Sequence, residues 1–368
     1  MKIGIPKEIK NHEYRVGLTP MSVSKIIANN HKVFIEIDAG AEIGFSNDMY
    51  EKAGAIIMKS PKELYEVSEL IVKVKEPMPE EFQYLNDQHT IFAYLHLAGN
   101  KKDALELAST GITGIALETV TADDGSMPLL SPMSAIAGQL SILVGSYHLL
   151  KPNKGMGTLI GAFENVEPRV VTVIGAGVAG REAIKKAIDN RAHVIVVDLS
   201  SQRLSELENA FGNKNIEYIL STEASIKNAL KKSDLVVGAV YVVGKKAPQV
   251  VKDSMLKEMK PGAVMVDISI DQGGCFESSK PTTHANPTYE HEGVIHYCVT
   301  NMPGAVPLTA TEALNKATLP YILKLADKGI DNALLENPHL ANGLNIHKRL
   351  IVHLSLIHIS EPTRRRGI

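Results

Sequence analysis

The sequence predicts an α/β protein built from two doubly wound, Rossmann-like domains with mainly parallel sheets. Apolar strand-like runs alternate with helix-like segments along most of the chain, a pattern typical of parallel sheets covered by helices. The chain has 368 residues, which is enough for two domains of ordinary size. The strand-like runs fall into two series, and a long apolar segment of helical length separates them.

The first series of predicted strands lies in the N-terminal third of the chain. Helix-length segments, such as 22–29 and 101–109, separate some of its members. Runs this apolar favour strands that are buried on both faces, as in a parallel sheet. The predicted strands are KIGIP (2–6), KVFIEI (32–37), AIIM (55–58), LIVKVK (70–75), TIFAYL (90–95) and ITGIALE (112–118).

The separating segment, MSAIAGQLSILVGSYHLL at 133–150, is the most apolar long stretch of the sequence. It is shorter than the roughly 20 apolar residues of a typical membrane span. Gln139, Ser146 and His148 also interrupt it. We therefore expect a buried helix that connects the two domains, and no membrane association.

The second series of predicted strands follows this helix. Its members are RVVTVIG (169–175), HVIVVD (193–198), IEYIL (216–220), DLVVGAV (234–240), AVMVDISI (263–270) and VIHYCV (294–299). Beyond them, TATE (309–312) has the spacing of a capping box and predicts a helix that runs to about Asp327. No further series of strands is expected. The second domain should therefore span 129–305, and 306–353 should complete a discontinuous first domain that begins with 1–128.

The last residues, LSLIHISEPTRRRGI at 354–368, continue neither pattern. They closely resemble the translated read-through of a sequencing adapter. We expect an artefactual tail and assign no function to its His358 or to Arg364–Arg366, although an ordinary basic tail would have a similar composition.

Composition excludes several other classes of protein. Hydrophobic residues make up 44% of the chain and charged residues 22%, as in globular proteins. The formal net charge of −2 offers no electrostatic surface for nucleic acid or an anionic membrane. The start of the chain, MKIGIPKEIK, lacks the apolar core of a signal peptide. Cys275 and Cys298 suggest neither a metal site nor a disulfide framework, so we expect a cytoplasmic protein.

The strongest local motif is GAGVAG, which follows a predicted strand and opens a predicted helix. In this context Gly175 permits a tight turn, Gly177 lets the backbone approach a pyrophosphate, and Gly180 allows close packing of helix and strand. Asp198 ends the next strand, where a carboxylate binds ribose hydroxyls and repels a 2′-phosphate. The motif therefore predicts NAD, although the nearby Arg203 is compatible with NADP. A glycine-rich turn beside a surface aspartate is the alternative.

Several polar residues occur where predicted strands end, which is where open α/β sheets bind ligands. They are Arg15, Lys75, His96, Asp271 and Asn301. Each also has a structural explanation. The arginine is compatible with a solvated surface, and the lysine with an outward-facing pair on an edge strand. The histidine is compatible with a core and the aspartate with an Asx-turn. Together they predict a site for a small anionic substrate beside a nicotinamide.

The motifs around these residues resemble the L-alanine dehydrogenase family from residue 1 to about residue 350. They are IGIPKEIKNHEYRVGLTP, LIVKVKEP, YLHLA, VTVIGAGVAG, DISIDQGGCFE and CVTNMPGAVPLTAT. The resemblance implies a reversible, NAD-dependent reaction in which L-alanine and water give pyruvate and ammonium. It also implies a homohexamer, a substrate domain and an NAD-binding domain, with the active site in the cleft between the domains.

The resemblance further implies the role of individual residues. Arg15 and Lys75 would hold the substrate, His96 would be the general acid/base, and Asp271 would be its catalytic partner. Glu118 is of a type that ligates metals, but it has no clustered partner and no metal is expected. Besides Gly175, Gly177 and Gly180, the cofactor contacts would be Ser134, Val178, Asp198, Arg203, Ser221, Val240, Tyr241, Ile268, Ser269, Ile270, Asp271, Lys280, Val299, Thr300, Asn301 and Met302.

Two other functions use similar motifs. One is the nucleotide-binding subunit of a transhydrogenase, which is not expected to carry a histidine at the position of His96. The other is a saccharopine-type dehydrogenase. Its larger substrate requires a larger pocket, and the sequence alone does not give the size of a pocket.

Overall fold

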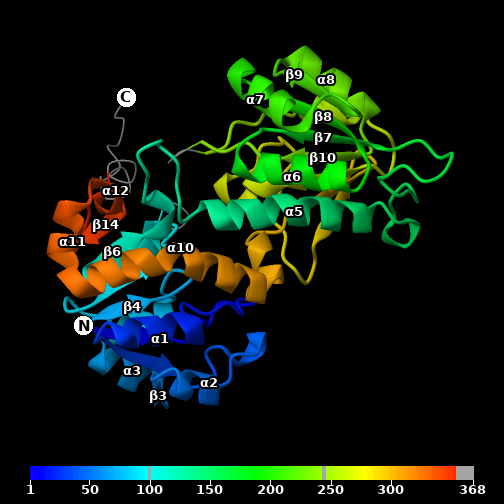
Figure 1. Ribbon diagram of the computed structural model, residues 1–368. Coiled ribbons are helices and arrows are strands. Elements are labelled where there is room, and N and C mark those ends of the chain that lie inside the picture. The colour runs from blue at the N-terminus through cyan, green and yellow to red at the C-terminus, as the bar shows by residue number, and fades with distance from the viewer. Residues whose placement is uncertain (98–100, 243–245, 354–368) are drawn as a thin grey trace, which may run out of the picture. The chain divides into compact units, whose positions relative to one another are not determined.

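The computed structural model describes residues 1–97, 101–242 and 246–353, which form two compact α/β units (Figure 1). Among the described residues, unit 1 consists of the chain from Met1 to Pro132 and from Val306 to His353, and unit 2 consists of Met133–Ala305. Each unit has its own mainly parallel sheet, which confirms the predicted fold class. The tail at 354–368 lies outside the described residues.

Unit 1 contains an eight-stranded sheet with the order β15-β14-β6-β5-β4-β1-β2-β3. The six strands from the N-terminal segment are parallel to one another. They are β1 (Lys2–Ile5), β2 (Lys32–Glu36), β3 (Ile56–Met58), β4 (Leu70–Val72), β5 (Thr90–Ala93) and β6 (Thr113–Ala116). The helices between them are α1 (Pro20–Ala28), α2 (Asn47–Lys52), α3 (Pro61–Val67) and α4 (Lys101–Ser109), with the 3-10 turns η1 (Ala41–Ile43), η2 (Pro79–Tyr84) and η3 (Leu117–Thr119).

The C-terminal segment returns to unit 1 through the long helix α10 (Pro307–Lys328). Polar contacts fix this return, because Asn315 accepts the Thr19 N–H at 2.8 Å and donates to the Gly17 carbonyl at 3.1 Å. The predicted start of this helix is wrong. The helix begins at Pro307, where a proline suits the first turn, and Thr309 therefore lies inside the helix.

Two short strands lie beyond α10, where the sequence predicted no further series of strands and indicated no individual strand. After α11 (Ile330–Glu336) and α12 (Pro338–Ala341), β14 (Leu344–His347) pairs antiparallel with β6, and β15 (Leu350–Ile351) pairs with β14. The sequence LNIH carries too little apolar pattern to predict a strand. It becomes one because the edge of β6 offers unpaired backbone groups.

Unit 2 contains a seven-stranded sheet with the order β12-β13-β11-β10-β7-β8-β9. Its parallel strands are β7 (Val170–Ile174), β8 (His193–Asp198), β9 (Ile216–Leu220), β10 (Leu235–Gly238), β11 (Val264–Asp267) and β13 (Val294–Tyr297). The strand order reverses direction between β7 and β10, which is the switch point of a Rossmann-type sheet. The polar edge strand β12 (Thr288–His291), which the sequence did not predict, pairs antiparallel with β13.

Helices cover the sheet of unit 2 and fix the position of its loops. They are α5 (Ser131–His148), α6 (Val178–Asp189), α7 (Ser201–Phe211), α8 (Glu223–Lys232) and α9 (Asp253–Leu256), with the 3-10 turns η4 (Lys151–Asn153), η5 (Ile268–Gln272) and η6 (Met302–Ala305). Gly138 of α5 packs against α6 so closely that a Cβ there would lie 2.1 Å from the Ala179 carbonyl oxygen.

The helix predicted at 133–150 is only half-buried. Ile142 is buried, whereas Leu143 is 61% exposed and Tyr147 is 58% exposed. The helices of the described ranges include none that is long and apolar enough for a membrane span.

Candidate active site

The glycines of the GAGVAG turn each have a different role in unit 2. Gly175 has φ +94°, and a Cβ there would lie 2.5 Å from the Ala239 carbonyl oxygen at the switch point. A Cβ on Gly180 would lie 1.8 Å from the Gly175 carbonyl oxygen, so this glycine lets α6 pack on the turn. A Cβ on Gly177 would meet no atom within 4 Å. The space beside Gly177 at the N-terminus of α6 is therefore open, and helix N-termini of this kind are suited to phosphate groups.

Asp198 fixes the same turn to the end of β8. Its carboxylate accepts the Ala176 N–H at 2.7 Å and the Ser200 N–H at 2.8 Å. The Arg203 guanidinium lies 3.6 Å from that carboxylate and is half-exposed. The Ser221 N–H donates to the Asp198 carbonyl at 2.9 Å. The turn, the acidic residue and the arginine are thus together, and this Rossmann-type arrangement fits a nucleotide cofactor.

Most other predicted cofactor residues follow strands at the carboxyl edge of the same sheet. Val240 and Tyr241 follow β10, and the Ser269 hydroxyl of η5 donates to the Val240 carbonyl at 2.7 Å. Those that follow β11 are Ile268, Ser269, Ile270 and Asp271, and those that follow β13 are Val299, Thr300, Asn301 and Met302. Asp271 is exposed.

Two predicted cofactor residues lie elsewhere in the fold. Ser134 lies within the first turn of α5. Lys280 is exposed, and its ammonium lies 5.9 Å from the centre of the Tyr289 ring. Val178 is 45% exposed at the start of α6.

Lys75 and His96 meet at the carboxyl edge of unit 1. They lie three residues beyond the ends of the neighbouring strands β4 and β5, and Nζ of Lys75 is 3.4 Å from Nε2 of His96. The imidazole stacks on the Tyr94 ring, with 5.8 Å between the ring centres and 11° between the ring planes. His96 has φ +45°, a left-handed conformation that is uncommon outside glycine. The strand ends thus bring a cation and an imidazole into contact.

The environment of His96 favours its neutral form. Its side chain is 39% exposed, although its ring packs against Tyr94 and Lys75. Desolvation, and then the positive charges of Lys75, Lys10 and Arg15, lower the pKa of His96 well below its usual range. A neutral imidazole can accept a proton at neutral pH.

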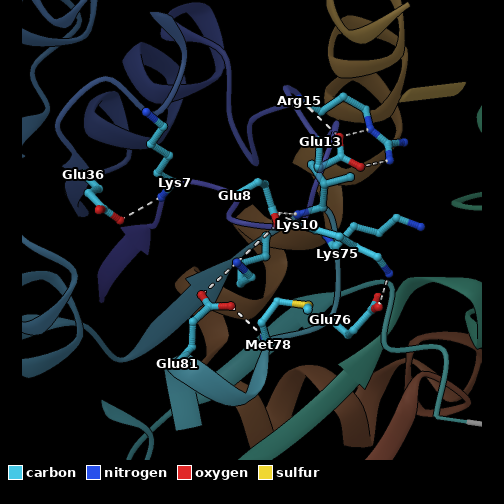
Figure 2. A network of polar contacts seen from close by, with 12 residues as sticks. Lys7, Glu8, Lys10, Glu13, Arg15, Glu36, Lys75, Glu76, Met78 and Glu81 are labelled. Carbon is cyan, nitrogen blue, oxygen red and sulfur yellow. Dashed lines mark hydrogen bonds and ion pairs between the residues drawn. The ribbon is translucent and has the colours of Figure 1, made fainter. Parts of the chain in front are cut away.

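Arg15 is 2% exposed, which rules out the solvated arginine that was one interpretation of the sequence. Its Nε donates to Glu13 at 2.6 Å, and its Nη2 donates to the other oxygen of the same carboxylate (Figure 2). Burial alone lowers the pKa of Arg15, but the hydrogen bonds and charge of Glu13 raise it above its usual value. The guanidinium therefore stays charged and in a fixed orientation.

Lys73 and Lys75 differ in role, although the sequence places them together. The strand β4 lies between β1 and β5, so the outward-facing pair on an edge strand is wrong. The Lys73 ammonium is buried and lies 3.2 Å from Glu8 and 2.9 Å from Glu81. Burial lowers the pKa of Lys73, but these two carboxylates raise it further than burial lowers it. Lys73 is therefore a buried structural cation, and Lys75 is the lysine beside His96.

The carboxylates that surround this site carry no sequence signal that assigns them a role. Glu8 and Glu13 lie in the quoted motif IGIPKEIKNHE, and Glu118 was considered only as a metal ligand. Their partners are backbone or side-chain groups brought close by the fold. A signal that can find such residues is a buried cation in the middle of an apolar run, because it requires an acidic partner.

The fold and these residues define a two-domain α/β protein with a Rossmann-type nucleotide-binding unit. The family model described as "Alanine dehydrogenase/PNT, N-terminal domain" matches residues 4–137, and the C-terminal model of the same family matches residues 141–354. The chain therefore belongs to the alanine dehydrogenase/PNT family, as its motifs indicated.

Individual relatives agree with this assignment. The alanine dehydrogenase of Halomonas elongata is 47% identical over 347 residues, covering 94% of this chain and 93% of the relative. That of Bacillus subtilis is 46% identical over 346 residues, covering 94% and 91%. A solved structure of an L-alanine dehydrogenase has a TM-score of 0.93 and 45% identity, covering 98% and 99% of the two chains. A transhydrogenase structure from Sinorhizobium meliloti shares the fold, with a TM-score of 0.81 and 23% identity over 96% of this chain and all of the other.

Proposed function

We propose that the protein catalyses the reversible, NAD-dependent oxidative deamination of L-alanine to pyruvate and ammonium. The observation that carries this proposal is the contact between Lys75 and His96, 3.4 Å apart at the ends of two neighbouring strands. Lys75 would supply a cation that binds the substrate, and His96 would supply a neutral base that takes a proton from water. The identity to alanine dehydrogenases along almost the whole chain supports the same function.

The substrate carboxylate would be held by Arg15 and Lys75. A guanidinium presents a planar set of donors to a carboxylate, and a lysine presents a compact charge. NAD, when bound, would supply the hydride acceptor, and loss of hydride from Cα of the neutral amine would give an iminium ion. Asp271 would act near the reacting carbon as the catalytic partner of His96. The expected position of this site, in the cleft between domains, stays a prediction.

His96 would move the proton of the attacking water. Its neutral imidazole would accept a proton as water adds to the iminium carbon, and would return that proton to the nitrogen of the carbinolamine. Ammonia would then leave as the imidazole takes the proton of the carbinolamine hydroxyl, which becomes the keto oxygen of pyruvate. Desolvation, and then the charges of Lys75, Lys10 and Arg15, lower the pKa of His96. A bound substrate carboxylate would offset part of this positive charge, which would help the imidazole to hold the proton that it takes from water and later returns.

The preference for NAD over NADP would come from Asp198. Its carboxylate, fixed against the GAGVAG turn, would bind the ribose hydroxyls and repel a 2′-phosphate. The predicted contacts along the carboxyl edges of β10, β11 and β13 would hold the rest of the dinucleotide.

We also propose that the protein assembles as a homohexamer. An exposed apolar surface of unit 2 supports assembly, because patches of this kind mark protein–protein contacts. It is formed by one side of α5 and by the segment that follows, whose Gly157 N–H bonds to the Leu149 carbonyl. Its residues are Leu143, Tyr147, Leu150, Leu159, Phe163 and Val166. Light scattering of the purified protein should give the mass of six copies, and a monomer would contradict the proposal.

The reaction is tested by following NADH formation with a panel of amino acids. L-alanine should be oxidised with NAD, and NADP should support little turnover. A preference for a larger amino acid would favour a saccharopine-type dehydrogenase. Nucleotide binding without turnover of any amino acid would favour a transhydrogenase subunit, and either result would refute the proposed reaction.

A further inference from the structure

Each of the two residues that meet at the edge of unit 1 has its backbone held by a carboxylate from another segment. Glu118, in η3 after β6, accepts the His96 N–H at 2.7 Å and the Leu95 N–H at 3.2 Å. Only 17% of its side chain is exposed. Two consecutive N–H groups therefore converge on one carboxylate.

This contact accounts for the unusual backbone of His96. A left-handed conformation is unfavourable for a residue with a Cβ, and it persists only where the surrounding structure fixes it. The carboxylate of Glu118 offsets this cost by accepting a charge-assisted hydrogen bond from the His96 N–H. Nδ1 of His96 lies 3.9 Å from the same carboxylate, which is too far for a hydrogen bond. Glu118 therefore acts on His96 through the main chain rather than through the imidazole.

A second carboxylate holds the main chain that follows the neighbouring strand β4. Glu8, in the loop after β1, accepts the Val74 N–H at 2.7 Å and the Lys75 N–H at 3.3 Å (Figure 2). Its other oxygen lies 3.2 Å from the buried Lys73 ammonium. The chain segments that follow the neighbouring strands β4 and β5 are thus each held by a carboxylate that accepts two consecutive backbone N–H groups.

We infer that Glu118 and Glu8 are positioning residues, which set the distance between the His96 imidazole and the Lys75 ammonium by fixing the main chain beneath each. The inference rests on the proposed function for what those two groups do. Glu118 offers the cleaner test, because Glu8 also balances the charge of Lys73.

The test compares Glu118→Gln with Glu118→Asp in the full chain. Glutamine keeps an acceptor oxygen at the same reach without the charge. Aspartate keeps the charge but is shorter by about one carbon–carbon bond, or about 1.5 Å. If reach matters, Glu118→Gln retains most of the kcat for the reductive amination of pyruvate with ammonium and NADH. Glu118→Asp then loses about 100-fold in kcat, because a displacement of about 1 Å in a reacting group has that effect. The KM for NADH should change in neither variant.

A second measurement needs no turnover. The rate at which diethyl pyrocarbonate modifies His96, followed by mass spectrometry across pH, reports the pKa of its imidazole. Because the nearby Lys75 helps to lower this pKa, releasing the main chain in Glu118→Asp should raise it towards the usual value for histidine. Glu118→Gln should not raise it, because removing a negative charge 3.9 Å from Nδ1 can only lower the pKa of the imidazole. The control is Glu69→Asp: Glu69 accepts the Lys2 N–H at 2.7 Å in an exposed contact, and this change should move neither measurement.

The outcomes are distinct. Greater activity in Glu118→Asp than in Glu118→Gln would show that charge matters rather than reach, and would overturn the inference. Equal loss in both variants, or wild-type behaviour in both, would also overturn it. Absence of turnover in the wild-type protein would refute the proposed function, and the modification profiles would still decide whether Glu118 positions His96.

Discussion

The open space beside Gly177 leads to a prediction that separates stability from nucleotide binding. In Gly177→Ala, the new Cβ meets no protein atom within 4 Å, and the residue already has φ −69°, which alanine adopts freely. Fewer unfolded conformations favour the alanine by about 0.4–1 kcal/mol. Alanine is less favourable than glycine at a helix N-cap, which opposes this gain. The free energy of unfolding should therefore change by less than about 1 kcal/mol, or roughly 4 °C in Tm.

Nucleotide binding should respond quite differently. The Cβ at position 177 would occupy the space through which the backbone approaches the pyrophosphate. Loss of one hydrogen bond to a charged phosphate costs about 1.5–3 kcal/mol. That corresponds to a roughly 10- to 150-fold increase in the Kd for NADH.

Gly180→Ala serves as the contrasting variant. Its Cβ would lie 1.8 Å from a backbone oxygen, so α6 must shift, and overpacking of this kind costs about 1–3 kcal/mol. Fluorescence titration with NADH and thermal unfolding should therefore show both properties impaired in Gly180→Ala, and binding alone impaired in Gly177→Ala. Wild-type NADH affinity in Gly177→Ala would refute the assignment of this space to the pyrophosphate.

Three further predictions concern buried or reactive side chains. Lys73→Met leaves two buried carboxylates without their cation and should lower the free energy of unfolding by about 3–5 kcal/mol in denaturant titrations. The exposed Lys62→Met should change it by about 0.5 kcal/mol or less, and equal effects would contradict this explanation. His96→Ala should lower kcat by about 10²–10⁴ without changing the Kd for NADH, and near-normal turnover would exclude it as the base. Burial lowers the pKa of His296 to about 4, so the protein should lose stability as the pH falls from 6.5 towards 4, where the unfolded chain binds the proton first. In His296→Gln this loss should be smaller by about 3 kcal/mol, and an unchanged pH dependence would refute it.

The sequence allowed the parallel strands and the glycine turn to be predicted because their signals are local. Long apolar runs require burial, and the three glycines are spaced for one turn. The strands TYEH and LNIH were missed because neither has an apolar pattern of its own. Each forms where an existing sheet edge offers backbone partners, which is a property of the tertiary structure.

The candidate site shows the same limit. His96 and Lys75 were found because each is an unexpected polar residue at the end of an apolar run. The carboxylates that hold them were not, because Glu8 lies 66 residues from the Val74 N–H and Glu118 lies 22 residues from the His96 N–H. Which lysine is the buried structural cation, Lys73, and which lies beside His96, Lys75, also depends on where β4 ends. The predicted strand extended to Lys75, whereas the observed strand stops at Val72.

The pairing of β14 with β6 has a consequence for how the chain is made. At a synthesis rate of about 5–20 residues per second, roughly 10 to 45 seconds separate the appearance of β6 from that of its partner. All of unit 2 emerges from the ribosome within that interval and can fold first. During this time the edge of β6 is an open template for any other extended chain. A chaperone that shields strand edges should therefore raise the yield of this protein most when it is present during translation, rather than during refolding of the complete chain.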